Sequence, residues 1–190
     1  MFCDAFEDSW RVYGFSEPPV AAAKDLFYMC WRSQPGFFFI FEEEGLLLGY
    51  LIAPLSMRKL VIDSLINGSA IRLAFRFLSG QYGIRFKDAL KASIGASSNL
   101  FLRRKGLPSC DSRILSIGVS KSAQGKGIGR KLMLKGLQAL DGGGASKVRL
   151  EVRRDNRPAH HLYCDLGFAD AGVIESPTGP WVVMVRKHHE

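Results

Sequence analysis

The 190-residue sequence predicts an α/β fold in which helices flank a mixed central sheet. Two observations predict this class. Apolar runs of strand length alternate along the chain with segments of helical periodicity, and a glycine-rich turn joins one such strand directly to a helix. Because 47% of the residues are hydrophobic, the chain can bury a sizeable core, and we expect residues 1–190 to form a single domain.

The first part of the chain predicts a helix and a hairpin. Residues 20–32 have helical periodicity and end before Gln34-Pro35-Gly36, where a helix cannot continue. Two apolar runs, 37–41 and 46–53, follow on either side of Glu42-Glu43-Glu44-Gly45. The turn chemistry of that tetrapeptide predicts a β-hairpin.

The second part predicts a β-α-β-α unit and two closing strands. The apolar run 114–119 precedes a helix in which Leu132, Met133, Leu137 and Leu140 share one face. Residues 148–152 form the next strand, and Pro158 suits the first turn of a second helix that Asp155 or Asn156 can cap. The final strands are expected at 168–174 and 181–185.

The glycine-rich turn has the chemistry of an anion cradle. Glycines let the backbone approach a ligand closely, and the following helix start points free N–H groups at it. A P-loop is excluded because Ser120 and Gly127 stand where it needs glycine and Ser or Thr, and the spacing G-x-G-x-G is not that of a dinucleotide fingerprint. The turn consists of Gln124, Gly125, Lys126, Gly127, Ile128, Gly129 and Arg130.

A second motif lies about 30 residues further on. At 3.6 residues per turn, Asn156, Ala159 and Tyr163 fall along one stripe of the second helix. Gly167 then provides a C-terminal stop. An amide, a small residue and a phenol therefore share one face.

Together the two motifs resemble those of the GCN5-related N-acetyltransferases (the GNAT superfamily). The loop is similar to the family's Q-x-x-G-x-G, and residues 150–168 are similar to its L-x-V-x-x-x-N-x-x-A-x-x-L-Y-x-x-L-G-F signature. The resemblance implies the GNAT fold and acetyl-CoA as cosubstrate, with no metal. It assigns residues 124–130 to the CoA pyrophosphate, and Ile117, Gly118, Val119, Asn156 and Ala159 to the pantetheine arm and thioester.

The resemblance also implies the chemistry. Tyr163 would protonate the departing thiolate while an amine attacks the thioester directly in a ternary complex. One position departs from the family, because Arg113 stands where many members carry a glutamate that serves as a base. Asp111 would face the same side if the strand extended that far.

Residues 56–110 look like an insertion of basic, amphipathic, helical character before the cofactor-binding strand. Ten basic and two acidic residues give this segment a net charge of +8, which equals that of the whole chain. Three interpretations stay open: a helical cap with its apolar face packed on the acceptor side and its basic face solvated, a contact with a membrane surface or anionic ligand, and a nucleic-acid interface. The sequence disfavours the last because no nucleic-acid-binding motif accompanies the charge.

The sequence therefore predicts an N-acetyltransferase acting on a primary amine, with an amino sugar as the suggested acceptor because the insertion resembles that of GNAT proteins found with polysaccharide-assembly genes. Alternatives are a protein N-terminal or lysine acetyltransferase, and a non-catalytic acyl-CoA-binding module that would not need Tyr163. Four cysteines without a pairing pattern and the lack of a signal peptide or membrane-length apolar run predict free thiols and a cytoplasmic location. The sequence leaves the oligomeric state open, with monomer and homodimer as the two alternatives.

Overall fold

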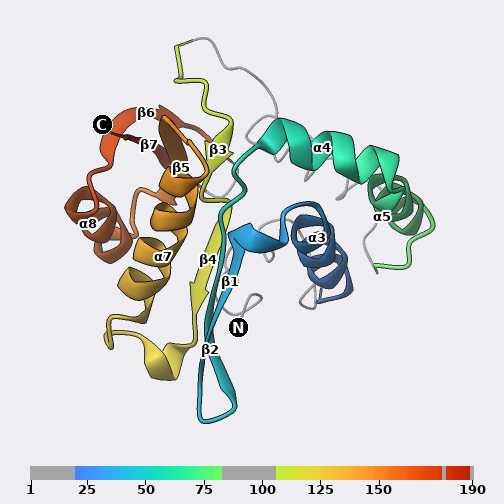
Figure 1. Ribbon diagram of the computed structural model, residues 1–190, viewed down its shortest axis with the longest axis horizontal. Coiled ribbons are helices and arrows are strands. Elements are labelled where there is room, and N and C mark those ends of the chain that lie inside the picture. The colour runs from blue at the N-terminus through green and yellow to red at the C-terminus, as the bar shows by residue number, and fades with distance from the viewer. Residues whose placement is uncertain (1–19, 83–105, 177–178, 189–190) are drawn as a thin grey trace.

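The computed structural model describes residues 20–82, 106–176 and 179–188. In this part of the chain, two sheets are flanked by helices, in agreement with the predicted α/β class (Figure 1). One sheet has the strand order β1-β2-β4 and the other has the order β3-β5-β7-β6.

The first sheet is built on a tight hairpin. Strands β1 (Phe38–Glu43) and β2 (Leu46–Ile52) are antiparallel and are joined by Glu44 and Gly45, both with positive φ (52° and 74°). Two such residues make the turn that best matches the twist of the strands. The observed turn has two residues rather than the four that the sequence predicted. Glu42 and Glu43 belong to β1, in which the register shifts between Phe41 and Glu42.

The second sheet has β5 (Lys147–Arg153) near its middle. This strand pairs antiparallel with β7 (Trp181–Lys187), which in turn pairs with β6 (Ala169–Ile174). On its other side, β5 pairs in parallel with the short strand β3 (Ser112–Arg113).

The predicted continuous strand 114–119 is wrong in one respect that matters for the site. The chain leaves the second sheet after β3, passes through Ile114 and Leu115, and joins the first sheet as β4 (Ser116–Val119), antiparallel to β2. This crossing places the two sheets side by side and lets them diverge from one point.

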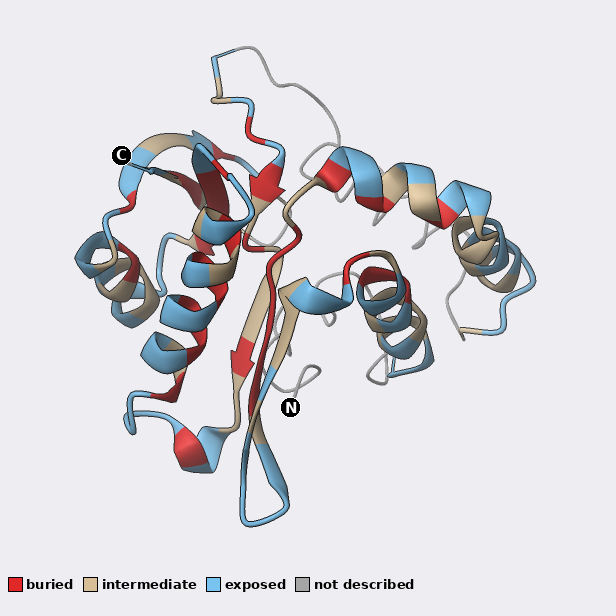
Figure 2. Cartoon of the chain, in the orientation of Figure 1, coloured by how far each residue is buried: buried red, intermediate tan, exposed pale blue. Residues whose placement is uncertain are grey.

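Two helices cover opposite faces of the first sheet. Helix α7 (Ile128–Gly142) contributes Leu132, Met133 and Leu137 to a cluster that includes Leu51 of β2. Helix α3 (Val20–Ser33) packs Met29 and Cys30 against Tyr50 and Ile52, which alternate with Leu51 along the strand. Figure 2 shows both helices with their buried residues turned toward the sheet.

The remaining helical elements are short. Helix α8 (Arg157–Asp165) packs near α7, and the 3₁₀ turns η1 (Pro35–Phe37) and η2 (Lys121–Ala123) precede β1 and α7. The first half of the predicted insertion forms α4 (Met57–Ile66) and α5 (Ser69–Leu78), which project beside α3 (Figure 1). Residues 83–105 lie outside the described residues, so the insertion as a whole stays a prediction.

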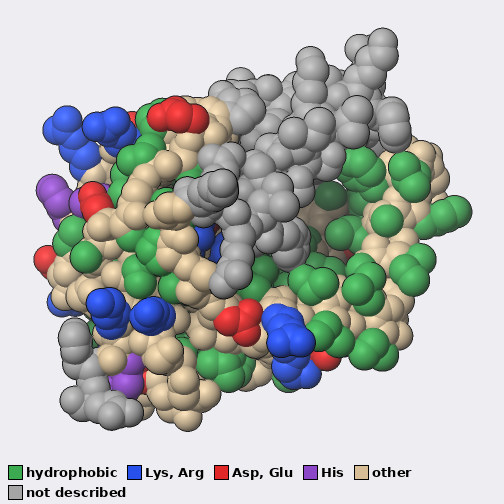
Figure 3. Space-filling view, turned by 90° about the horizontal axis from the view of Figure 1, so that it is seen from above, with side chains coloured by type: hydrophobic (Ala, Val, Ile, Leu, Met, Phe, Trp, Pro, Cys, Tyr) green, Lys and Arg blue, Asp and Glu red, His purple; other side chains and the backbone are tan. Residues whose placement is uncertain are grey.

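Helix α5 does not orient its faces as the sequence suggested. Its apolar residues Ile71, Phe75 and Leu78 are each about two-thirds exposed, whereas Arg76 turns toward α3 and pairs with Asp25 at 2.6 Å. Figure 3 shows hydrophobic side chains gathered at the end of the molecule that α4 and α5 form. The interpretation of a packed apolar face and a solvated basic face is therefore wrong for these four residues of α5, although Arg72 on the same helix is exposed.

The cysteine prediction is confirmed where it can be followed. Cys30, Cys110 and Cys164 are free thiols, and Cys3 lies outside the described residues. Among the helices of the described ranges, none has both the length and the apolar character required to span a bilayer.

Candidate active site

A gap opens between β4 and β5. The pairing of β3 with β5 ends at Arg113 and Arg149. One further backbone hydrogen bond joins the two segments, in which Ile114 N donates to Arg149 O (2.9 Å). Beyond this point, within the described residues, β4 pairs with β2 and β5 pairs with β7, but they do not pair with each other. The two strand edges therefore face each other across the gap.

The backbone of β4 offers hydrogen-bonding groups to this gap. Ser120 N donates to Leu48 O (2.9 Å), which fixes the phase of the alternation along an antiparallel pair. The same alternation turns the backbone groups of Gly118 toward β2 and those of Ile117 and Val119 away from it. Of the three residues predicted to meet the pantetheine arm, Ile117 and Val119 thus present backbone groups on the side of the gap.

Gly118 has a packing reason of its own. A Cβ at this position would lie 2.6 Å from Cε1 of Tyr50, so only glycine lets the Tyr50 ring lie across β4. The Tyr50 hydroxyl is 3.0 Å from Ser116 Oγ, which holds the ring in place. This glycine shapes β4 from the α3 side.

The glycine-rich loop stands at the open end of the gap. Gly125 and Gly127 have φ of 78° and 74°, and a Cβ built on either would meet no atom within 4 Å. Gln124 donates from Nε2 to Val119 O (3.3 Å), which ties the loop to the end of β4. The glycines are therefore needed for their left-handed backbone, and they leave open space above it.

The N-terminus of α7 follows at once. Gly127 is its N-cap and supplies no side-chain hydrogen bond, and the first turn closes with Lys131 N donating to Gly127 O (3.0 Å). The amides of Ile128, Gly129 and Arg130 precede this bond and have no partner within the helix. The Ile128 side chain is buried in the core, so this residue can offer a ligand only its backbone.

Gly129 borders the gap from the helix side. Its Cβ would lie 3.8 Å from Leu162 of α8 and 3.9 Å from Val119 of β4. Both are ordinary van der Waals distances, so the fold itself does not require glycine here. A ligand that passed between Val119 and Leu162 would require it.

Two basic side chains accompany the loop. Lys126 and Arg130 are exposed, and Arg130 Nη1 pairs with Asp165 of α8 at 3.2 Å. An exposed pair of this kind contributes little to stability, so a phosphate can compete with Asp165 for the guanidinium. Both side chains belong to the loop at which the sequence predicts pyrophosphate binding.

Helix α8 carries the second motif. Of the two predicted candidates for the cap, Asn156 caps it, because Oδ1 accepts a hydrogen bond from Ala159 N (3.2 Å). The amide group keeps its two N–H donors for another partner. Ala159 is half-buried and packs against the main core.

Tyr163, on the same helix, is buried rather than exposed at the surface. It is buried in the cluster that also contains Val152 of β5, and its ring packs edge-on against Phe168 with the centroids 6.1 Å apart. Burial raises the pKa of Tyr163 to about 12, which keeps the phenol protonated at neutral pH. Over the residues that the structure describes, no group hydrogen-bonds its hydroxyl.

A charged cluster marks the point where the strands diverge. Glu151 Oε1 lies 2.7 Å from Arg149 Nη2 and 3.7 Å from Arg113 Nη1, and all three side chains are largely buried. Burial lowers the pKa of the Arg113 guanidinium, an effect that Glu151 opposes. The cluster faces the α3 side of the sheet, because Val148, Leu150 and Val152 take the alternate positions in the core below α7.

The sequence analysis predicted neither the position of Glu151 in this cluster nor the structural role of Asp111. The alternation of charged and apolar residues along β5 is the signal that could have placed Arg149 and Glu151 on one face. The strand does not extend to Asp111, which instead accepts a hydrogen bond from Arg58 N (2.9 Å) in the first turn of α4. Asp111 is therefore a structural residue.

Comparison with known proteins fits this geometry. The family model described as the acetyltransferase (GNAT) family matches residues 2–168. The chain belongs to this family. Both the family resemblance and the fold class predicted from the sequence are thereby confirmed.

Solved GNAT-like structures share the fold at low identity. The structure of SsHAT aligns with a TM-score of 0.68 and 22% identity, over 93% of this chain and 84% of that one. PH1933 from Pyrococcus horikoshii OT3 aligns with a TM-score of 0.58 and 20% identity, over 100% and 89%. At such identities the likeness concerns the fold alone.

Curated relatives match over a shorter stretch. A mycothiol acetyltransferase of Nocardioides sp. (strain ATCC BAA-499 / JS614) is 47% identical over 55 residues, which is 29% of this chain and 19% of that protein. The chain thus spans about a fifth of the length of this relative.

Proposed function

We propose that this protein transfers the acetyl group of acetyl-CoA to a primary amine by direct attack. The observation that carries the proposal is the divergence of β4 from β5 with the uncapped N-terminus of α7 at its open end. An extended pantetheine arm fits the gap as a strand would, and a pyrophosphate fits the loop amides.

The residues divide the work. Residues 124–130 hold the pyrophosphate, and the backbone of Ile117 and Val119 holds the pantetheine arm. The cosubstrate supplies a thioester. The amine nitrogen forms a bond to its acetyl carbon, the C–S bond breaks, and the thiolate takes the proton of the Tyr163 hydroxyl. The nitrogen releases one proton to solvent, and the Tyr163 phenolate regains one from solvent, so the phenol is restored.

The acceptor approaches from the α3 side of the sheet, because α7 and the core close the other side. We propose an amino sugar as the acceptor class. The name of the relatives, mycothiol acetyltransferase, supports a small molecule over a protein. The basic segment 56–110 also disfavours a polycationic amine.

Calorimetric titration with acetyl-CoA tests the cosubstrate, with dephospho-CoA and NAD as controls. Saturable micromolar binding of acetyl-CoA, with thiol released when amino sugars are added, is the expected result. Binding without thiol release from any amine would favour a non-catalytic module instead. The absence of acetyl-CoA binding would contradict the proposal that the protein is an acetyltransferase.

A further inference from the structure

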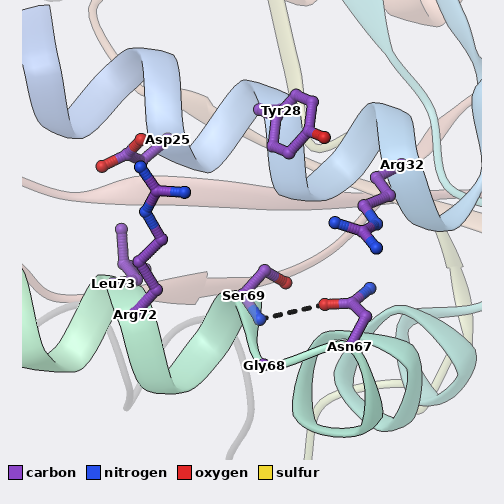
Figure 4. Close-up of a pocket in the computed structure, with 8 residues that line it drawn as sticks. All are labelled: Asp25, Tyr28, Arg32, Asn67, Gly68, Ser69, Arg72 and Leu73. Atoms are coloured by element: carbon purple, nitrogen blue, oxygen red, sulfur yellow. Dashed lines mark hydrogen bonds between the residues drawn. The ribbon is translucent and has the colours of Figure 1, made fainter.

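An open pocket of about 330 Å³ lies away from the glycine-rich loop, between α3 and the turn that joins α4 to α5. Its polar lining comes from two distant stretches of sequence: Asp25, Tyr28 and Arg32 on α3, and Asn67, Ser69 and Arg72 at the turn and on α5. Figure 4 shows Arg32 and Arg72 entering from opposite helices. The volume is at the lower end of the range of small-ligand sites.

The pocket has an excess of positive charge. Its one carboxylate, Asp25, is already engaged, since it accepts hydrogen bonds from Arg76 Nη1 (2.6 Å) and from the Tyr82 hydroxyl (2.5 Å). Arg76 does not line the pocket. Across the described ranges, neither the Arg32 nor the Arg72 side chain forms a hydrogen bond or an ion pair. The Arg72 guanidinium lies beside Asp25 (Figure 4) and interacts with it electrostatically without a hydrogen bond. Both guanidinium groups therefore keep N–H donors for a ligand.

Neutral donors complete the lining. Asn67 Oδ1 accepts from Ser69 N (3.0 Å), which leaves the Asn67 amide group as a donor. The Ser69 and Tyr28 hydroxyls lie at the same pocket (Figure 4). Planar guanidinium groups flanked by neutral donors match the oxygens of a phosphate better than those of any uncharged group.

The position of the pocket relates it to the acceptor. Helix α3 packs on the face of the first sheet that carries Tyr50 and Leu115, and Leu115 lies between β3 and β4 where the gap begins. The pocket on α3 is thus on the side from which the acceptor must come.

We propose that this pocket binds a phosphate ester of the acceptor, so that the preferred substrate is a phosphorylated or diphosphate-linked amine. This proposal rests on the proposed function, because the pocket can bind an acceptor only if the protein transfers an acetyl group. The phosphate comes either from a soluble ester or from a lipid headgroup. Because α5, which contributes Arg72 to the pocket, also exposes the apolar residues Ile71, Phe75 and Leu78, the lipid source is tested separately.

The test uses inorganic pyrophosphate as the soluble probe, titrated into the full chain saturated with CoA so that the loop is occupied. Phosphatidylcholine vesicles with and without phosphatidic acid form the second arm. The variants are Arg32→Gln and Arg72→Gln, and Arg58→Gln is the matched control because it removes the same charge from α4 at an exposed site outside the pocket.

Loss of about tenfold in pyrophosphate affinity in Arg32→Gln and Arg72→Gln, with Arg58→Gln unchanged, is the expected result. The same pattern with phosphatidic acid vesicles alone would support the proposal and identify a lipid phosphate. Equal weakening by all three variants would reveal general electrostatic attraction and overturn it, as would the absence of binding in both arms.

A Gly127→Val variant separates this proposal from the proposed function. It should lose acetyl-CoA binding and keep pyrophosphate binding at the pocket, whereas Arg72→Gln should do the reverse. If Arg72→Gln abolished acetyl-CoA binding, the two sites would not be distinct and the pocket assignment would fail.

Discussion

The glycine-rich loop and the pocket on α3 both suit anions, but they are built from different parts of the polypeptide. At the loop the donors are backbone amides, positioned by the left-handed φ of Gly125 and Gly127. At the pocket they are side chains, Arg32 and Arg72, which lie 40 positions apart in the sequence. A backbone site depends on conformation and a side-chain site depends on charge, so different changes should break them.

The largest effect is expected from Gly127→Val. A branched Cβ would enter the open space over the loop and strain a left-handed residue, so acetyl-CoA affinity should fall by about 100-fold or more. Gly144→Val is the matched control, because Gly144 has a similar φ of 82° and open surroundings at the other end of α7. Calorimetry on both variants checks this, and equal binding in the two would show that the loop assignment is wrong.

The next largest effect is expected from Tyr163→Phe, which tests the proposed general acid. Without the hydroxyl, kcat should fall about 100-fold while acetyl-CoA affinity stays nearly unchanged. The contact with Phe168 is kept, so thermal unfolding should confirm an intact fold. Weaker cofactor binding with normal turnover would contradict the role of general acid.

Gly129→Ala should produce a smaller and sharper result. Alanine is favoured in a helix by up to about 1 kcal/mol, and the contacts of its Cβ at 3.8 and 3.9 Å are unstrained, so the free protein should gain stability. Acetyl-CoA affinity should nevertheless drop about tenfold, because the methyl group borders the gap. Gly142→Ala, at the last residue of the same helix, should leave acetyl-CoA affinity unchanged. Equal acetyl-CoA affinities in the two variants would show that the ligand does not require glycine at position 129.

The smallest effect appears only in alkali. Burial raises the pKa of Tyr163 to about 12, whereas an unfolded tyrosine titrates near pH 10. Between these values the unfolded chain releases a proton that the folded chain keeps, so this residue makes stability fall by about 1.4 kcal/mol per pH unit. Denaturant unfolding of wild type and Tyr163→Phe from pH 9 to 11 should show a steeper decline in wild type, and parallel curves would place the phenol in solvent.

The same contrast explains what the sequence could predict. The loop and the cap at Asn156 follow from residues that are neighbours in sequence, and their local chemistry indicated both. The Arg113–Glu151–Arg149 cluster and the Arg76–Asp25 pair join residues on different elements, so only the folded chain shows them. The prediction for α5 was wrong for a related reason, because Arg76 pairs with Asp25 on α3, a partner that helical periodicity alone cannot identify.

The passage of the chain from β3 in one sheet to β4 in the other has a consequence for the protein without its cosubstrate. The two sheets meet along few hydrogen bonds, and the amides of Ile117 and Val119 face a slot that only solvent can satisfy until an extended ligand enters. A ligand there acts as a missing strand that fastens one half of the molecule to the other. Bound acetyl-CoA would then stabilise the contact between the two sheets. The acetyl-CoA concentration would thus affect the stability of the fold as well as the rate of turnover.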